Sequence, residues 1–156
     1  MGYNNSVQEI GKKLRICIEI LYKKDLFLIE SSVSERSIGH KLAEYLQVGF
    51  QYWNVDCECN RIYEQVKELR GTNECSAQRI TERIYPDIIV HEGNTAKNLV
   101  VIEIKVNIDG DSDIKKLEKL TSTVSEFSYK VGYFIRFSKE EERHLIRRFQ
   151  GGREVP

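Results

Sequence analysis

The sequence predicts an α/β protein with a mixed central sheet of about four strands flanked by helices. Helical patterns mark four segments of the chain, and the alternating or continuous apolar patterns of strands mark four others. Two strand segments are joined by a short connection, whereas other strands are linked by long crossovers. The sheet is therefore expected to contain both antiparallel and parallel pairs.

The composition favours one domain spanning residues 1–156. At 40% hydrophobic content the chain is long enough for one core. Its 24 basic and 24 acidic residues are interspersed, so a nucleic-acid partner would require a local basic groove. The apolar stretches fall far short of the ~20 residues that span a membrane, and residues 1–13 lack an apolar signal core. We expect a cytoplasmic protein without a membrane partner.

The four cysteines favour buried thiols in a reducing compartment over a disulfide framework. Cys17 falls in a helical apolar stripe, and Cys57 and Cys59 share one face of a predicted strand. A zinc site built from Cys57, Cys59, Cys75 and His91 is the alternative, although the spacing matches no familiar zinc module.

Two helices and a strand are predicted in the first 59 residues. A helix over 6–24 and a second helix beginning after Ser32 or Ser34 follow from apolar residues at three-and-four spacing. The buried stripe of the second helix is expected to contain Ile38, Leu42, Tyr45 and Leu46. Residues 52–59 then alternate apolar and polar side chains, the period of a half-buried strand.

The middle of the chain predicts a hairpin of two strands. Residues 61–84 carry no clear pattern and stay unassigned. Strands over 87–91 and 98–106 follow, and the polar loop between them contains Gly93, Asn94 and Thr95, which suit a hairpin turn.

The last third of the chain predicts a helix, a strand and a terminal helix. The helix over 113–127 would place Leu117, Leu120, Val124 and Phe127 on one face, and a strand would follow over 129–137. Acidic residues near the start and arginines near the end predict a helix over 139–149. The polar tail 151–156 is expected to be frayed.

Charged residues interrupt the most apolar strand. Side chains alternate between the faces of a strand, so Glu103 and Lys105 share one face of 98–106. An unpartnered buried charge is costly, so the two side chains must form an ion pair, reach water at an edge or serve chemistry. The hairpin would bring Asp87, fixed at its strand start by Pro86, beside them. Two converging carboxylates repel, and Mg²⁺ or Mn²⁺ would relieve that repulsion.

This pattern resembles a known nuclease signature. "PD" at 86–87, fifteen intervening residues and "EIK" at 103–105 resemble the motif of the PD-(D/E)XK nuclease superfamily, whose restriction-endonuclease-like fold carries it on two adjacent strands. The predicted elements over about 34–137 also resemble the αβββαβ core of that superfamily, and the chain looks most like its small stand-alone bacterial or phage members. The resemblance implies a Mg²⁺- or Mn²⁺-dependent nuclease acting on DNA.

The resemblance also assigns roles to individual residues. Asp87 and Glu103 match the two acidic metal ligands, and Lys105 matches the catalytic lysine. The backbone carbonyl of Ile104 would be a further metal ligand. A lysine beside the metal is expected to orient or deprotonate the attacking water and to stabilise charge on the phosphate.

Many members of the superfamily add an acidic residue from the first core helix, and two candidates exist. Glu35 lies roughly 20° around the helix from Leu42, in the apolar stripe, whereas Glu44 lies roughly 160° away and should face water. We therefore assign Glu35 to the catalytic and metal-binding set. The alternative is that Glu35 forms a capping box with Ser32.

Several other polar residues have an ordinary structural interpretation as well as a functional one. Asp56, Glu58 and His91 are further candidates to approach the site on neighbouring strands, although solvated or hydrogen-bonded side chains are commoner. Five basic residues are candidate contacts to a DNA backbone, with the wet face of a helix as the alternative. They are Lys115, Lys116, Lys119, Arg147 and Arg148.

Three functional hypotheses follow. The first is a metal-dependent nuclease acting on DNA. The second is a protein of the same fold that binds nucleic acid or a protein partner without cutting, which the neutral net charge favours. The third is a small regulatory protein in which Asp87, Glu103 and Lys105 form only structural ion pairs. Cleavage of both strands of a duplex would suit a homodimer.

Overall fold

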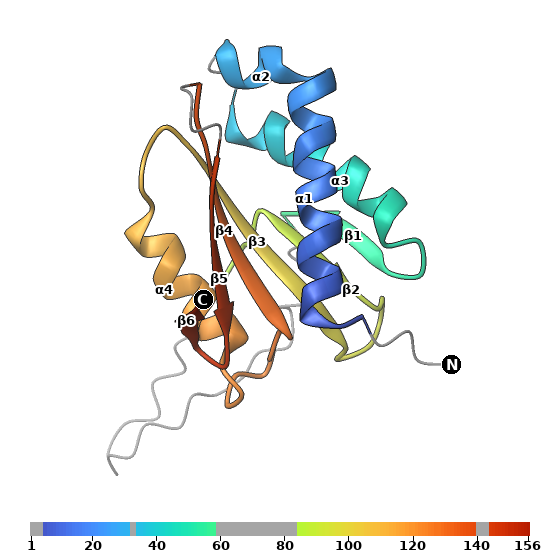
Figure 1. The fold of residues 1–156 in the computed structure, drawn as a ribbon. Coiled ribbons are helices and arrows are strands. Elements are labelled where there is room, and N and C mark those ends of the chain that lie inside the picture. The colour runs from blue at the N-terminus through green and yellow to red at the C-terminus, as the bar shows by residue number, and fades with distance from the viewer. Residues whose placement is uncertain (1–4, 32–33, 59–83, 140–143) are drawn as a thin grey trace.

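A six-stranded mixed sheet with helices on both faces forms the centre of the structure (Figure 1). The computed structural model describes residues 5–31, 34–58, 84–139 and 144–156. The strands lie in the sheet in chain order. They are β1 (Asn54–Cys57), β2 (Ile88–His91), β3 (Asn98–Val106), β4 (Val131–Phe137), β5 (His144–Gln150) and β6 (Arg153–Val155).

The helices form two layers around this sheet. Helices α1 (Val7–Lys24), α2 (Leu26–Glu30) and α3 (Glu35–Gly49) lie on one side, and α4 (Asp111–Thr121) lies on the other (Figure 1). A capping box of Ser6 and Glu9 begins α1. The predicted helices at 6–24 and from Ser34 onwards are confirmed, while the short α2 between them was not predicted.

Strand β3 lies between an antiparallel and a parallel neighbour. It pairs with β2 as a hairpin, with Ile88 opposite Ile102 and Ile89 opposite Val101, so the predicted hairpin is confirmed. It pairs with β4 in parallel, because the chain returns through α4 before entering β4. The predicted mixed sheet is therefore confirmed, with more strands than expected.

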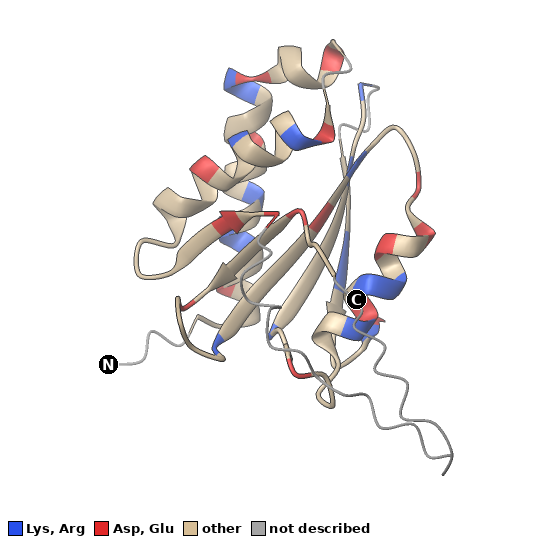
Figure 2. Cartoon of the chain, turned by 180° about the vertical axis from the view of Figure 1, so that it is seen from behind, with Lys and Arg blue, Asp and Glu red and all other residues tan. Residues whose placement is uncertain are grey.

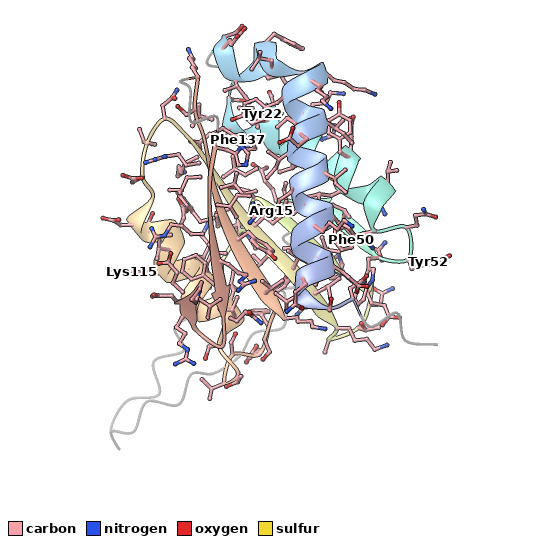
Figure 3. All side chains as sticks on the ribbon, viewed as in Figure 1. Arg15, Tyr22, Phe50, Tyr52, Lys115 and Phe137 are labelled. Atoms are coloured by element: carbon pink, nitrogen blue, oxygen red, sulfur yellow. The ribbon has the colours of Figure 1, made fainter. Side chains whose placement is uncertain are left out.

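The larger core lies between the sheet and helices α1–α3. From β3 it takes Val100, Ile102 and Ile104, all of them buried. Tyr22 of α1 meets Phe137 of β4 with ring centroids 5.9 Å apart, as Figure 3 shows between these two elements. Each such fully buried side chain contributes about 1.5–3 kcal/mol.

The smaller core lies between the sheet and α4. Leu117 and Leu120 of α4 pack with Val101, Phe134 and Phe149. The alternation predicted for β3 is thus confirmed, because Val101 belongs to this face and its neighbours Val100 and Ile102 to the other. Glu103 and Lys105 are therefore on the α4 side of the strand.

The helix predicted over 113–127 is shorter than expected. Helix α4 ends at Thr121, and Val124 is 93% exposed rather than buried. Ser122 is extended, and its carbonyl and hydroxyl oxygens accept hydrogen bonds from the backbone N–H groups of Ser125 and Val124. Serine that bonds the local backbone in this way competes with helical hydrogen bonds.

The predicted terminal helix over 139–149 is wrong. Residues 144–150 form strand β5, antiparallel to β4, and the tail expected to be frayed forms β6. Gly151 and Gly152 join the two strands with φ of 60° and 80°. Two-residue hairpin turns of type I′ require positive φ at both residues, and glycine adopts positive φ readily. Two consecutive glycines in the sequence are therefore consistent with such a turn.

The cysteine predictions have a mixed outcome. Cys17 is buried as expected, but Cys57, on the edge strand β1, is exposed. Cys59 and Cys75, and with them the alternative zinc site, lie outside the described residues, as does nearly all of the unassigned segment 61–84.

The part of the chain that the structure describes has no helix with both the length and the apolar character needed to cross a bilayer.

Gly132 allows the close approach of α4 to β4, and its replacement tests that packing. A Cβ there would lie 2.9 Å from Cγ2 of Thr121 and 3.2 Å from Cδ2 of Leu117. We expect Gly132→Ala to lower the free energy of unfolding by about 1–3 kcal/mol, measured by urea denaturation.

Gly39→Ala is the matched control for this substitution. Its Cβ would make an ordinary 3.6 Å contact with Ile104, and alanine favours the interior of α3. We expect no loss of stability, and equal losses in the two variants would contradict the packing argument.

Candidate functional site

Asp87, Glu103 and Lys105 meet at the end of the β2–β3 hairpin. The register that sets Ile88 opposite Ile102 brings Asp87 opposite Glu103. The Oδ2 atom of Asp87 accepts a hydrogen bond of 2.7 Å from the backbone N–H of Ile104. Since this bond crosses between the two strands, it fixes the Asp87 carboxylate at the carboxyl end of β3.

Glu103 is a buried carboxylate in the middle of the protein. Its side chain is 1% exposed, and the neighbouring residues of β3, Val101, Ile102 and Ile104, are apolar and buried. Its Oε2 accepts a 2.9 Å hydrogen bond from Nζ of Lys116 on α4. Its Oε1 has no hydrogen-bond partner in the described parts of the chain. Buried polar atoms are nearly always paired, so an unpaired carboxylate oxygen is a candidate ligand atom.

Lys105 joins the hairpin to α3. Its Nζ donates to Oε2 of Glu35 at 3.2 Å, and Oε1 of Glu35 accepts a 3.3 Å hydrogen bond from the backbone N–H of Val106. Glu35 thus reaches the site, as its helical position predicted. The capping-box alternative is wrong, because Ser34 is the N-cap and bonds Ser37, so Glu35 is the first residue of α3.

Asp113 belongs to the same network and was not predicted. It is buried in the first turn of α4, with Oδ2 3.4 Å from Nζ of Lys105 and Oδ1 3.6 Å from Nζ of Lys116. A Cβ at Gly110 would lie 2.5 Å from Oδ2 of Asp113 and 3.1 Å from Cε2 of Phe134, so a larger residue there would require the Asp113 side chain to shift. The sequence signal was the three-residue spacing of Asp113 and Lys116 directly after the motif strand.

Burial raises the pKa of both motif carboxyls. Burial first, then the charge of Asp87, raises the pKa of Glu103 to about 8, against the opposing effect of Lys116. Burial also raises the pKa of Asp87, although the Ile104 N–H and the two lysines oppose that change. For Lys105 burial lowers the pKa, but the hydrogen bond and charge of Glu35 and the charge of Asp113 outweigh it, so the net change is upward.

The charges of this network are unbalanced. Three carboxylates, those of Glu35, Glu103 and Asp113, pair with the ammonium groups of Lys105 and Lys116, and a fourth, that of Asp87, interacts with both lysines only through its charge. Above about pH 8, where Glu103 is ionised as well, the acidic groups exceed the basic ones by two charges. A divalent cation would remove this excess, and carboxylate oxygens are the ligands that Mg²⁺ and Mn²⁺ prefer.

The donor set fits a metal held partly by water. No three Asp, Glu, His or Cys side chains among residues 5–31, 34–58, 84–139 and 144–156 gather closely enough to enclose a metal ion. Mg²⁺ commonly keeps several waters and takes only one or two carboxylates from the protein. Asp87 and the unpaired oxygen of Glu103 can supply those two.

The remaining predicted residues lie elsewhere. Glu44 is exposed and pairs with Lys41 and His40, as its place on the helix predicted. The side chain of Ile104 is buried in the larger core, and the role predicted for its carbonyl stays a prediction. Asp56 and His91 bond each other at 2.7 Å, and Glu58 pairs with Arg36.

The residues considered as DNA contacts have different surroundings in the structure. Lys116, a candidate DNA contact with the wet face of a helix as the alternative, points into the site and binds Glu103. Lys115 points away from the protein (Figure 3), and red and blue segments follow one another along α4 (Figure 2). Arg147 pairs with Glu154, and Arg148 bonds the carbonyl oxygen of Pro156.

No model of a known protein family matches this chain, and a search of curated proteins found no match.

The raised pKa of Glu103 predicts a pH-dependent stability. Its ordinary pKa is 4.5, and the folded protein raises it to about 8. The folded state therefore favours the protonated group, so the stability that this group contributes is present below about pH 4.5 and is lost as the pH rises to about 8. We expect the free energy of unfolding in EDTA to fall by roughly 2 kcal/mol or more across this range.

Glu103→Gln is the variant that isolates this effect. Glutamine keeps the size of the side chain and cannot ionise, so the fall in the free energy of unfolding should become much shallower. An unchanged pH dependence in the variant would show that other groups cause it.

Proposed function

We propose that the protein is a metal-dependent nuclease that hydrolyses phosphodiester bonds of DNA. The observation that carries the proposal is the convergence of Asp87, Glu103 and Lys105 at one end of the β2–β3 hairpin. Glu103 is buried there, and one of its oxygens has no hydrogen-bond partner in the part of the chain that the structure describes. A buried carboxylate is costly to ionise unless it is fully paired, and a bound cation would lower that cost.

The arrangement of elements supports the proposal. The chain runs in the order α3, β1, β2, β3, α4 and β4. In the sheet, β1 to β3 are antiparallel neighbours, and β4 is parallel to β3. This order agrees with the αβββαβ core that the motif led us to expect. Residues 144–156 extend the sheet by two strands beyond that core.

Asp87 and Glu103 would hold Mg²⁺ or Mn²⁺, with the carbonyl of Ile104 as a third protein ligand. The bound ion would lower the pKa of a water molecule and neutralise charge on the phosphate. The protein contributes rigidity, because the Ile104 N–H holds Asp87 and the packed sheet holds Glu103.

Lys105 would orient the attacking water and stabilise the developing charge of the phosphate. Its Nζ lies 3.2 Å from Oε2 of Glu35 and 3.4 Å from Oδ2 of Asp113. Helices α3 and α4, on opposite sides of the sheet, therefore both hold the ammonium group in place. Its side chain is 24% exposed, which gives a substrate access to it from solvent. Glu35 acts on the lysine in this scheme, in addition to the metal role suggested by the resemblance.

A non-cleaving protein of the same fold is the second candidate. The specific observation in its favour is Lys116, which already occupies one oxygen of Glu103. The net charge of zero also gives no general attraction to a polyanion. DNA binding that is unaffected by metal and gives no products would support this candidate.

Cleavage assays on single-stranded and duplex DNA test the nuclease directly. We expect cleavage with Mg²⁺ or Mn²⁺, none with EDTA, and a loss of about 100-fold or more in Asp87→Asn and in Lys105→Met. The first substitution removes a ligand charge, and the second removes the ammonium group while keeping the side-chain stem.

Glu44→Gln is the control, because Glu44 lies on the exposed side of the helix that carries Glu35. It should keep full activity, and circular dichroism should show that all variants are folded. Cleavage that needs no metal, or that survives both site substitutions, would exclude the proposed mechanism.

A further inference from the structure

Lys116 is placed as a cation within the candidate metal site. Its Nζ lies 2.9 Å from Oε2 of Glu103, 3.2 Å from the carbonyl oxygen of Tyr85 and 3.6 Å from Oδ1 of Asp113. Three oxygens from three segments of the chain therefore surround one positive charge. The motif gives no role to this lysine.

The contact differs from an ordinary surface ion pair. Exposed pairs contribute little, because water already solvates both charges. Here the carboxylate is 1% exposed, and its second oxygen has no partner in the described residues. Lys116 is therefore the nearest compensation for a charge that is costly to bury.

A divalent cation at Asp87 and Glu103 would compete with this ammonium group. Both positive charges are attracted by the same buried carboxylate, and they repel each other over a short distance. The Lys116 side chain is 24% exposed and has a long apolar stem, so its charged end can move towards solvent while the stem stays packed.

We propose that Lys116 is the internal counter-ion of the metal-free site and is displaced from Glu103 when a divalent cation binds. This inference rests on the proposed function, because it assumes that Asp87 and Glu103 bind metal. Lys116 then stabilises the metal-free protein and weakens metal binding. The two effects are linked, because the free energy by which Lys116 weakens metal binding equals the free energy by which the bound metal weakens the contact of Lys116 with Glu103.

Manganese titrations of metal-free protein by calorimetry test this exchange. Lys116→Met removes the charge and keeps the stem, and we expect it to bind Mn²⁺ about tenfold more tightly, or more, than wild type. Without metal the variant should melt at a lower temperature, and saturating Mn²⁺ should raise its melting temperature by more than that of wild type. Lys116→Gln is the substitute if the methionine variant does not fold, because its amide can still bond Glu103.

Two controls separate local displacement from general electrostatics. Lys115→Met removes the same charge from the next position of α4, where the side chain points away from the protein (Figure 3). It should bind Mn²⁺ as wild type does. Lys116→Arg keeps a positive charge at the site and should retain the weaker affinity of wild type.

The outcomes distinguish this inference from the proposed function. Unchanged or weaker Mn²⁺ binding in folded Lys116→Met or Lys116→Gln, the variants that remove the charge, would overturn the exchange and leave the metal site intact. Equal tightening in Lys115→Met would also overturn it, as a general effect of charge. If neither wild type nor any folded variant binds Mn²⁺, the metal site itself is excluded, and the exchange with it.

Discussion

The burial of the Glu103 carboxylate is the constraint on which the rest of the site depends. It lies on β3, the strand packed between β2 and β4 and covered by helices on both faces, where an ionised group needs compensation. Lys116 supplies part of it and thereby ties α4 to the sheet. Asp113 then links Lys116 to Lys105, and Lys105 links the network to Glu35 at the start of α3. Three layers of the fold thus meet in one group of charges.

The sequence was sufficient for the part of the site that local periodicity determines. The alternation along β3 gave the shared face of Glu103 and Lys105, and the short loop between two apolar runs gave the hairpin that brings Asp87 to them. Helical geometry alone separated Glu35, which reaches the site, from Glu44, which faces water. These predictions succeeded because neighbours in a strand or helix have nearly fixed directions.

The contacts of α4 and the end of the sheet were beyond this reasoning. Asp113 and Lys116 looked like a solvated helix face, and only the packing of α4 against β3 and β4 turns them inward. Residues 144–150 carry charges that suit a helix end, yet they form a strand because their backbone pairs with the edge of β4. The two glycines that follow are compatible with the end of a helix as well as with a tight hairpin turn, so they did not decide between the two.

The network as a whole has the properties expected of a cation site. It has more acidic than basic groups, a buried carboxylate with one oxygen that has no partner among the described residues, and a lysine ammonium group in contact with that carboxylate. The most direct test of this account is the anomalous scattering from crystals of the wild-type protein soaked in manganese. The account predicts an anomalous peak bound by the carboxylates of Asp87 and Glu103, with Nζ of Lys116 moved away from Glu103. A well-ordered site without a peak, or a peak bound only by other residues, would contradict it.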